Sequence, residues 1–114
     1  MTNSAEAAPT PDPTAGASAR IAVVGTSWWV ERMHLPALLS HPDAHVAAFC
    51  GRDAGRAAEL AGRVAAAGRP RPAVETRWET LVRRPDLDAV IVAVPDDLHL
   101  PVARAALDAG LHVC

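Results

Sequence analysis

The sequence predicts an α/β fold in which a doubly wound, mostly parallel sheet carries helices on both faces. Short apolar runs rich in valine and isoleucine alternate with segments whose apolar residues recur at helical spacing. Two of these runs, Ile21–Val24 and the stretch within Asp88–Val94, are apolar on both faces, as buried parallel strands are. Strands that alternate with helices in this way are typical of βαβ units around one sheet.

Composition limits the classes of protein to consider. The 114 residues, with a formal net charge of −2, suit one domain and give no reason to expect a nucleic-acid or membrane partner. No apolar run approaches the roughly 18 residues of a membrane span, and the N-terminus lacks the features of a secretion signal. Cys50 and Cys114 lie far apart, so we expect reduced cysteines, no metal site and a cytoplasmic location.

The N-terminal part of the chain divides into a tail and the start of a domain. Residues 1–19 are rich in Ala, Pro, Ser and Thr and are expected to form a disordered tail, because they cannot bury enough apolar surface. The domain is expected over residues 20–114, with Ile21–Val24 as its first strand. A helix is predicted over Trp29–Ser40, which Pro36 either kinks or starts in its regular part. The residues assigned to its apolar face are Met33, Ala37 and Leu38.

The middle of the chain predicts a second strand, a longer helix and a third strand. His45–Cys50 is the second strand, and Asp53 is the expected N-cap of a helix that runs to about Ala67 and stops at Gly68. Ala73–Glu75 is expected to be the third strand. The residues at helical spacing that should meet the sheet are Ala57, Leu60, Ala61 and Val64.

The last third of the chain predicts two more strands and two helices. A brief helix is expected over Trp78–Arg83, the strongest strand over Asp88–Val94, and a helix over Leu98–Ala109. Leu111–Cys114 then begins a fifth strand, after which the fold is expected to be truncated. We predict that the five strands lie in the order 3-2-1-4-5, with right-handed crossovers.

The turn after the first strand has part of a dinucleotide-binding fingerprint. Gly25 stands where the first glycine of G-x-G-x-x-G is expected, but Ser27 and Val30 replace the other two. Such a turn lets a pyrophosphate approach the backbone at the start of a helix. Trp28 and Trp29 follow at once; they either pack against a neighbouring domain or helix, or shield a cofactor.

Several motifs in order resemble the Gfo/Idh/MocA oxidoreductase family, named after glucose–fructose oxidoreductase, inositol dehydrogenase and the rhizopine-catabolism protein. Ile-Ala-Val-Val-Gly opens the match, and His34-Leu35-Pro36-Ala37-Leu38 is similar to a segment of the family's first helix. Asp88–Pro95 resembles the family's D-x-V-x-I-x-T-P strand, and Asp96–His99 resembles the N-x-x-H that follows it. Ala106–Val113 is similar to A-L-x-A-G-K-H-V.

The resemblance implies a Rossmann-type domain that binds a nicotinamide dinucleotide across the carboxyl ends of the strands. Gly25, Thr26 and Ser27 would face the pyrophosphate, and the loop that holds Pro95, Asp96 and His99 would lie near the nicotinamide. From the residues alone, Asp96 and Asp97 are an acid–base pair or, for at least one of them, a helix N-cap. His99 is a candidate ligand-binding residue because it lies just beyond the carboxyl end of a strand, whereas a histidine such as His34 more often packs or caps than binds.

The end of the second strand favours NADP over NAD, although NAD remains possible. An NAD site normally has an acidic residue here for the ribose hydroxyls, whereas this chain has Gly51 followed by Arg52. A guanidinium can bind a 2′-phosphate in bidentate fashion. The alternative is a solvated arginine beside the Asp53 cap.

These observations lead to two main hypotheses of function. The first is the cofactor domain of an oxidoreductase acting on a sugar, polyol or related alcohol, with its substrate domain missing. The second is a stand-alone module that binds or senses a dinucleotide, and a weaker third is a domain for another adenine-containing ligand. The resemblance implies a catalytic lysine in a Glu-Lys-Pro motif just after Cys114, but the chain contains no lysine. We therefore assign no catalytic residue, and the substrate and oligomeric state stay open.

Overall fold

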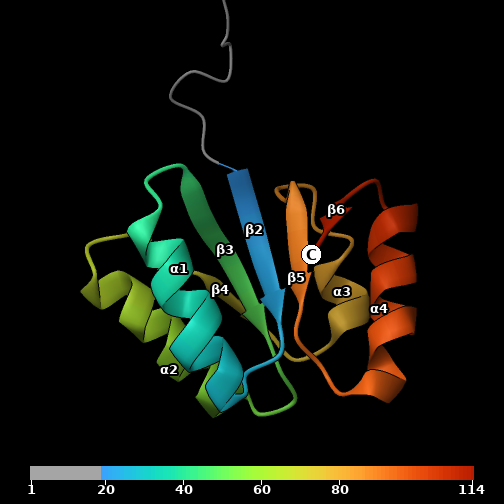
Figure 1. Cartoon of the computed structure of the whole chain (residues 1–114), viewed down its shortest axis with the longest axis horizontal. Helices are drawn as coiled ribbons and strands as arrows, with labels where there is room; N and C mark the ends of the chain where they lie inside the picture. Colours follow the sequence, from blue (N-terminus) through green and yellow to red (C-terminus); the bar gives the residue numbers. More distant parts are fainter. Residues whose placement is uncertain (1–18) are drawn as a thin grey trace, which may run out of the picture.

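The computed structural model describes residues 19–114, so the predicted tail lies outside the described residues except for Ala19. A single sheet of five strands forms the centre of the described part (Figure 1). Its strands lie in the order β4-β3-β2-β5-β6, and every pairing is parallel. In chain order the bounds are β2 (Ala19–Val24), β3 (Ala44–Cys50), β4 (Ala73–Glu75), β5 (Ala89–Val92) and β6 (His112–Val113). The predicted order 3-2-1-4-5 is confirmed.

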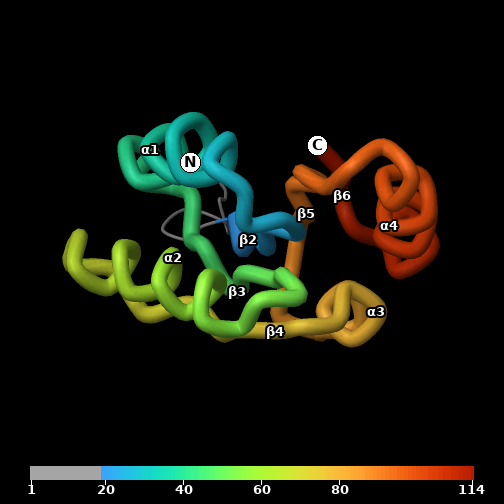
Figure 2. The backbone as a smooth tube through the Cα atoms, turned by 90° about the horizontal axis from the view of Figure 1, so that it is seen from below, coloured from blue at the N-terminus to red at the C-terminus, as the bar shows by residue number. Residues whose placement is uncertain are grey.

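Helices cover both faces of the sheet, which confirms the doubly wound architecture. Figure 2 shows α1 (Leu35–Ser40) and α2 (Ala54–Ala66) on one side, with α3 (Trp78–Leu81) and α4 (Asp96–Asp108) on the other. Each side has its own buried cluster, because the apolar side chains of alternate strand positions point to opposite faces. Because every pairing is parallel, the carboxyl ends of the strands lie at one edge of the sheet, between the two helix layers.

The α2 layer follows the sequence prediction closely. Asp53 caps the helix by accepting a hydrogen bond from the backbone N–H of Arg56 at 3.1 Å, and Gly68 ends it with a φ of 85°. The face that meets the sheet is the predicted one, and its members are fully buried: Ala57, Leu60, Ala61 and Val64. They pack against Val46 and Phe49 of β3 in the same cluster.

The first helix differs from the prediction in its N-terminal half. Before α1 lies one π-helical turn, η2 (Val30–His34), closed by the N–H of Leu35 donating to the carbonyl of Val30. This i→i+5 turn is wider than an α-turn, so the buried positions Val30 and Leu35 are five residues apart, and Leu38 follows three later. The assignment of Met33 and Ala37 to the core face is wrong, since both are exposed. Pro36 starts the regular part, in the first turn of α1.

The start of α4 also corrects the prediction. The helix begins at Asp96, two residues earlier than expected, and Pro95 occupies the N-cap position with an extended ψ of 154°. Neither Asp96 nor Asp97 is therefore an N-cap, and no side chain caps this helix. Both carboxylates lie in the first turn instead, where the partial positive charge of the helix N-terminus still favours them.

Candidate functional site

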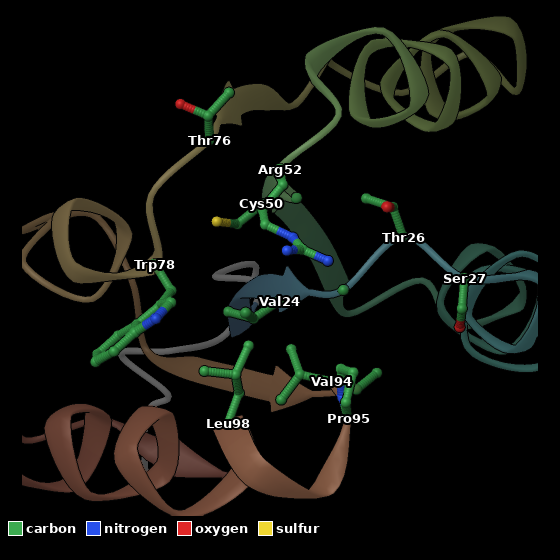
Figure 3. Close-up of a pocket in the computed structure, with 13 residues that line it drawn as sticks. Val24, Thr26, Ser27, Cys50, Arg52, Thr76, Trp78, Val94, Pro95 and Leu98 are labelled. Atoms are coloured by element: carbon green, nitrogen blue, oxygen red, sulfur yellow. The ribbon is translucent and has the colours of Figure 1, made fainter.

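A cleft of about 300 Å³ opens at the carboxyl edge of the sheet, between the ends of β2, β3 and β5. Its size is at the lower end of what small-molecule sites occupy. Figure 3 shows the residues that line this cleft. They come from the strand ends, from the turns that follow them and from the starts of α3 and α4. The lining residues are Val24, Gly25, Thr26, Ser27, Cys50, Gly51, Arg52, Thr76, Trp78, Ala93, Val94, Pro95 and Leu98.

Gly25 allows the backbone to turn sharply at the end of β2. Its φ of 123° lies in a region that side chains disfavour, and a Cβ atom here would come within 2.0 Å of the Ala93 carbonyl oxygen. The strand ends are tied on both sides of it, because Gly25 N–H donates to Cys50 and Ala93 N–H donates to Val24, each at 2.8 Å. The turn is thus a bare stretch of backbone at the floor of the cleft.

The end of β3 contributes one cationic side chain to the cleft. Arg52 follows Gly51, is exposed, and in Figure 3 its guanidinium extends from the end of β3 toward the end of β2. Within residues 19–114 its guanidinium has no ion-pair partner, although Asp53 is its neighbour and caps α2 instead. The cleft therefore holds a positive charge that the described part of the protein does not neutralise.

The next arginine along the chain, Arg56, is fully engaged. Its Nε donates to the Thr26 carbonyl at 3.0 Å, and its two terminal nitrogens pair with Glu31 at 2.6 Å and Glu59 at 2.8 Å. The hydrogen bond from Arg56 lowers the pKa of Glu31, which Arg63 also contacts at 2.7 Å. Arg56 thus fastens α2 to the turn that follows β2, and it holds the Thr26 carbonyl in place.

The opposite wall of the cleft contains residues that the sequence analysis did not assign. Trp78 and Leu98 border it on the side of α3 and α4, and Thr76 lies just after β4 (Figure 3). Their positions in the sequence could have identified Thr76 and Trp78, since both follow closely after the third strand and so reach the same edge of the sheet.

Cys50, at the end of β3, also lines the cleft. Burial, with the nearby carboxylates Glu75 and Glu79, raises the pKa of the Cys50 thiol to about 11, so the thiol stays protonated at neutral pH.

The structure brings five of the seven predicted site residues together. Those that line the cleft are Gly25, Thr26, Ser27, Arg52 and Pro95. Asp96 and His99 are exposed on the first turns of α4 and do not line it. Leu98 faces the cleft from that helix in their place. A role for Asp96 and His99 near a nicotinamide stays a prediction.

Two aromatic side chains stand close to the glycine turn but outside the cleft. Trp28 and Trp29 contact each other edge to face, with ring centroids 5.6 Å apart. They are 63% and 48% exposed, so no helix of residues 19–114 buries them. Their predicted packing against a neighbouring domain stays a prediction.

The described range holds neither a metal-ligand cluster nor a membrane-spanning helix. Among residues 19–114, no three His, Cys, Asp or Glu side chains gather as a metal site would require. No helix of that range is both long and apolar enough to cross a membrane.

Comparison with known proteins relates residues 19–114 to the family GFO_IDH_MocA, described as "Oxidoreductase family, NAD-binding Rossmann fold". A dTDP-3,4-didehydro-2,6-dideoxy-alpha-D-glucose 3-reductase of Streptomyces antibioticus is 37% identical over 94 residues, which are 82% of this chain and 27% of that protein. A glycosyl hydrolase family 109 protein of Streptomyces filamentosus is 35% identical over 98 residues, or 82% of this chain and 20% of that protein. The chain thus spans about a quarter of the length of these relatives.

Solved structures agree with these relationships. The 3-ketoreductase KijD10 of Actinomadura kijaniata, in complex with NADP, superposes with a TM-score of 0.73 at 35% identity, covering 84% of this chain and 29% of that one. An oxidoreductase domain protein of Kribbella flavida superposes with a TM-score of 0.72 at 33% identity, covering 85% of this chain and 26% of that one.

Proposed function

The chain belongs to the Gfo/Idh/MocA oxidoreductase family as its NAD(P)-binding Rossmann domain, and on that premise we propose that its cleft binds NADP(H) in preference to NAD(H). The observation that supports the proposal is the pair of residues that follows β3, Gly51 and Arg52. Gly51 offers no carboxylate to the adenosine ribose, and the Arg52 guanidinium lies in the cleft without an ion-pair partner in residues 19–114. A dianionic 2′-phosphate supplies the negatively charged partner that this arginine lacks in the described structure.

The residues of the cleft suit the rest of a dinucleotide as well. Gly25 lines the cleft and has no side chain, so a pyrophosphate can approach its backbone closely. The hydroxyls of Thr26 and Ser27 can donate hydrogen bonds to phosphate oxygens. Trp78 and Leu98 give the opposite wall an apolar surface that can exclude water from a flat ring.

We propose that hydride transfer belongs to a longer protein acting on a sugar-related substrate. A bound nicotinamide dinucleotide supplies or accepts the hydride; this chain's residues bind and orient it. The relatives named above include one reductase of a deoxysugar nucleotide and a 3-ketoreductase, and the chain covers only about a quarter of each. The 114 residues contain no lysine, the residue that the family resemblance assigns to proton transfer. We therefore expect no turnover of NADP with sugars or polyols by this chain alone.

Direct titration tests the cofactor preference. The purified chain is titrated with NADPH and NADH, with tryptophan fluorescence and calorimetry as readouts, and NADPH should bind at least about tenfold more tightly. Competition with 2′,5′-ADP and 5′-AMP isolates the contribution of the 2′-phosphate, so the former should displace NADPH better. Raising the salt concentration should weaken NADPH binding more than NADH binding, because screening acts on the extra charge. Equal affinities, or tighter NADH binding, would contradict the proposal.

A further inference from the structure

A cluster of three charged side chains joins the π-helical turn η2 to α2. One carboxylate oxygen of Glu31 accepts a hydrogen bond from Arg56 at 2.6 Å, and the other pairs with Arg63 at 2.7 Å. The two arginines lie two helical turns apart on one side of α2, so a single carboxylate holds both of them. Glu31 is only 26% exposed and Arg56 only 24%, which shelters their contact from solvent screening.

The cluster acts on the glycine turn through one backbone carbonyl. Arg56 Nε donates to the Thr26 carbonyl at 3.0 Å. The peptide bond from Thr26 to Ser27 is trans, and the C=O and N–H groups of a trans peptide point in opposite directions. The Ser27 N–H is therefore turned away from Arg56, and it has no acceptor within residues 19–114. Ser27 itself lines the cleft, whereas Arg56 does not.

We propose that Glu31 is a positioning residue for the phosphates of a bound dinucleotide. Glu31 holds the Arg56 guanidinium, Arg56 holds the Thr26 carbonyl, and the Ser27 N–H is thereby kept free to donate to a phosphate oxygen. The inference rests on the dinucleotide binding proposed above. The pyrophosphate is common to NADPH and NADH, so the contribution of Glu31 is the same for both and independent of the preference assigned to Arg52.

A simple charge argument predicts the opposite effect of removing Glu31. Loss of a carboxylate near a site for an anion should tighten binding, because it removes repulsion. Glu59 is the matched control, since it pairs with the same arginine at 2.8 Å and carries the same charge. It lies on the same helix as Arg56, however, and is 57% exposed. Comparing Glu31→Ala with Glu59→Ala separates the positioning effect from the loss of charge, and alanine costs neither site any helix propensity.

The first test measures binding of NADPH and NADH by calorimetry to the 114-residue chain and both variants. We expect Glu31→Ala to weaken both dinucleotides by about fivefold or more, the effect of one charge-assisted hydrogen bond, without changing their affinity ratio. Glu59→Ala should change both affinities by less than about twofold. Affinity for 2′-AMP, which has the 2′-phosphate but no pyrophosphate, should stay the same in Glu31→Ala. A general loss of structure would weaken 2′-AMP as well.

The second test asks whether Glu31 acts through Arg56. In an Arg56→Ala background, Glu31→Ala should cause no further loss of dinucleotide affinity, because the Thr26 carbonyl is already released. It should still lower Tm slightly, by no more than about 3 °C, because the pair with Arg63 is lost in either background. Losses of affinity that add would show that Glu31 acts by another route and would contradict the inference.

A titration with inorganic pyrophosphate separates this inference from the proposed function. Followed by nuclear magnetic resonance on the isotope-labelled chain, pyrophosphate should shift the Ser27 amide signal, and Glu31→Ala should weaken this binding. If the chain prefers NADH, or binds no dinucleotide, the proposed function fails, while the pyrophosphate titration still tests the role of Glu31. The inference is wrong if pyrophosphate leaves the Ser27 amide unchanged. It is also wrong if Glu31→Ala keeps or gains affinity, or if Glu59→Ala loses as much.

Discussion

Two arginines at opposite edges of the sheet, Arg20 and Arg52, have opposite surroundings. At the amino edge, Arg20 at the start of β2 donates to both oxygens of Asp88, from its backbone N–H at 2.8 Å and from its side chain at 3.0 and 3.1 Å. Arg69 donates to the carbonyls of Leu39 and Ala44 at 2.7 Å each. At the carboxyl edge, Arg52 extends into the cleft and has no ion pair within residues 19–114 (Figure 3).

This difference separates a structural arginine from a binding one. A paired arginine at the amino edge ties neighbouring segments together, so removing it should change stability and leave ligand selectivity alone. An arginine without a protein partner should do the reverse, because no other described residue loses a hydrogen bond or ion pair when it is removed. The experiments that follow test this division, from the largest expected effect to the smallest.

The largest effect is expected at the glycine turn of the carboxyl edge. Gly25→Ala should cost roughly 3 kcal/mol or more of unfolding free energy and abolish dinucleotide binding, since it adds both backbone strain and a collision with the Ala93 carbonyl. The matched control is Gly68→Ala, at a φ of 85° with nothing within 4 Å, which should cost only about 1–2 kcal/mol. Urea unfolding measures both. Equal losses would show that the approach to Ala93 is unimportant.

A smaller effect is expected where an arginine at the carboxyl edge is structural. Arg56→Ala should lower the unfolding free energy by about 1 kcal/mol, because the hydrogen bond to the Thr26 carbonyl is lost. It should weaken the binding of NADPH and of NADH by the same factor. Glu59→Gln removes only the negative charge of one exposed partner of Arg56 and should change either quantity little. A selective loss of NADPH binding in Arg56→Ala would place this residue in the 2′-phosphate site and contradict its structural role.

The smallest effect is expected at the amino edge and depends on pH. Hydrogen bonds from Arg20 lower the pKa of Asp88, so its carboxylate adds stability above the ordinary aspartate value of about 3.9 and loses it as the pH falls through the lower folded-state value. Both side chains are more than 40% exposed, so Asp88→Asn should lower Tm at pH 7 by no more than about 3 °C.

This difference in Tm should shrink as the pH falls below about 4, where the carboxylate of the unfolded chain is protonated. The control is Asp108→Asn, an exposed carboxylate on α4 without an ion pair in the described range. A Tm difference for Asp88→Asn that stays constant into acid would show that the Arg20 contact adds no pH-dependent stability.

The fold was predictable because it depends on patterns that repeat along the chain. Apolar runs marked the strands, the spacing of residues such as Leu60 and Val64 marked the buried face of α2, and Asp53 marked its start. The face of the first helix was missed because one π-helical turn changes the repeat locally, which exposed Met33. A uniform helical period cannot anticipate a turn that the tertiary packing of Val30 and Leu35 stabilises.

The site was predictable only in part, for a different physical reason. Gly25, Thr26, Ser27 and Arg52 follow directly on strand ends, so the topology of a parallel sheet is enough to gather them. Residues 26 and 51 lie so close that a Cβ atom at position 51 would come within 2.6 Å of Thr26 Cγ2, and this closeness has no signature in the order of residues. Which residues of a helix face a cleft also depends on where the helix starts, and α4 starts two residues earlier than the sequence indicates.

The central claim is that Arg52 serves a ligand and not the fold, and one measurement tests it most directly. NADPH and NADH affinities and Tm are determined for Arg52→Ala and for Arg104→Ala, an exposed arginine of α4 outside the cleft. We expect Arg52→Ala to weaken NADPH binding by about tenfold or more, while NADH affinity and Tm stay nearly unchanged. Arg104→Ala should change none of these three quantities. An Arg52→Ala variant that keeps its NADPH affinity, or that loses stability and both cofactors together, would contradict the account.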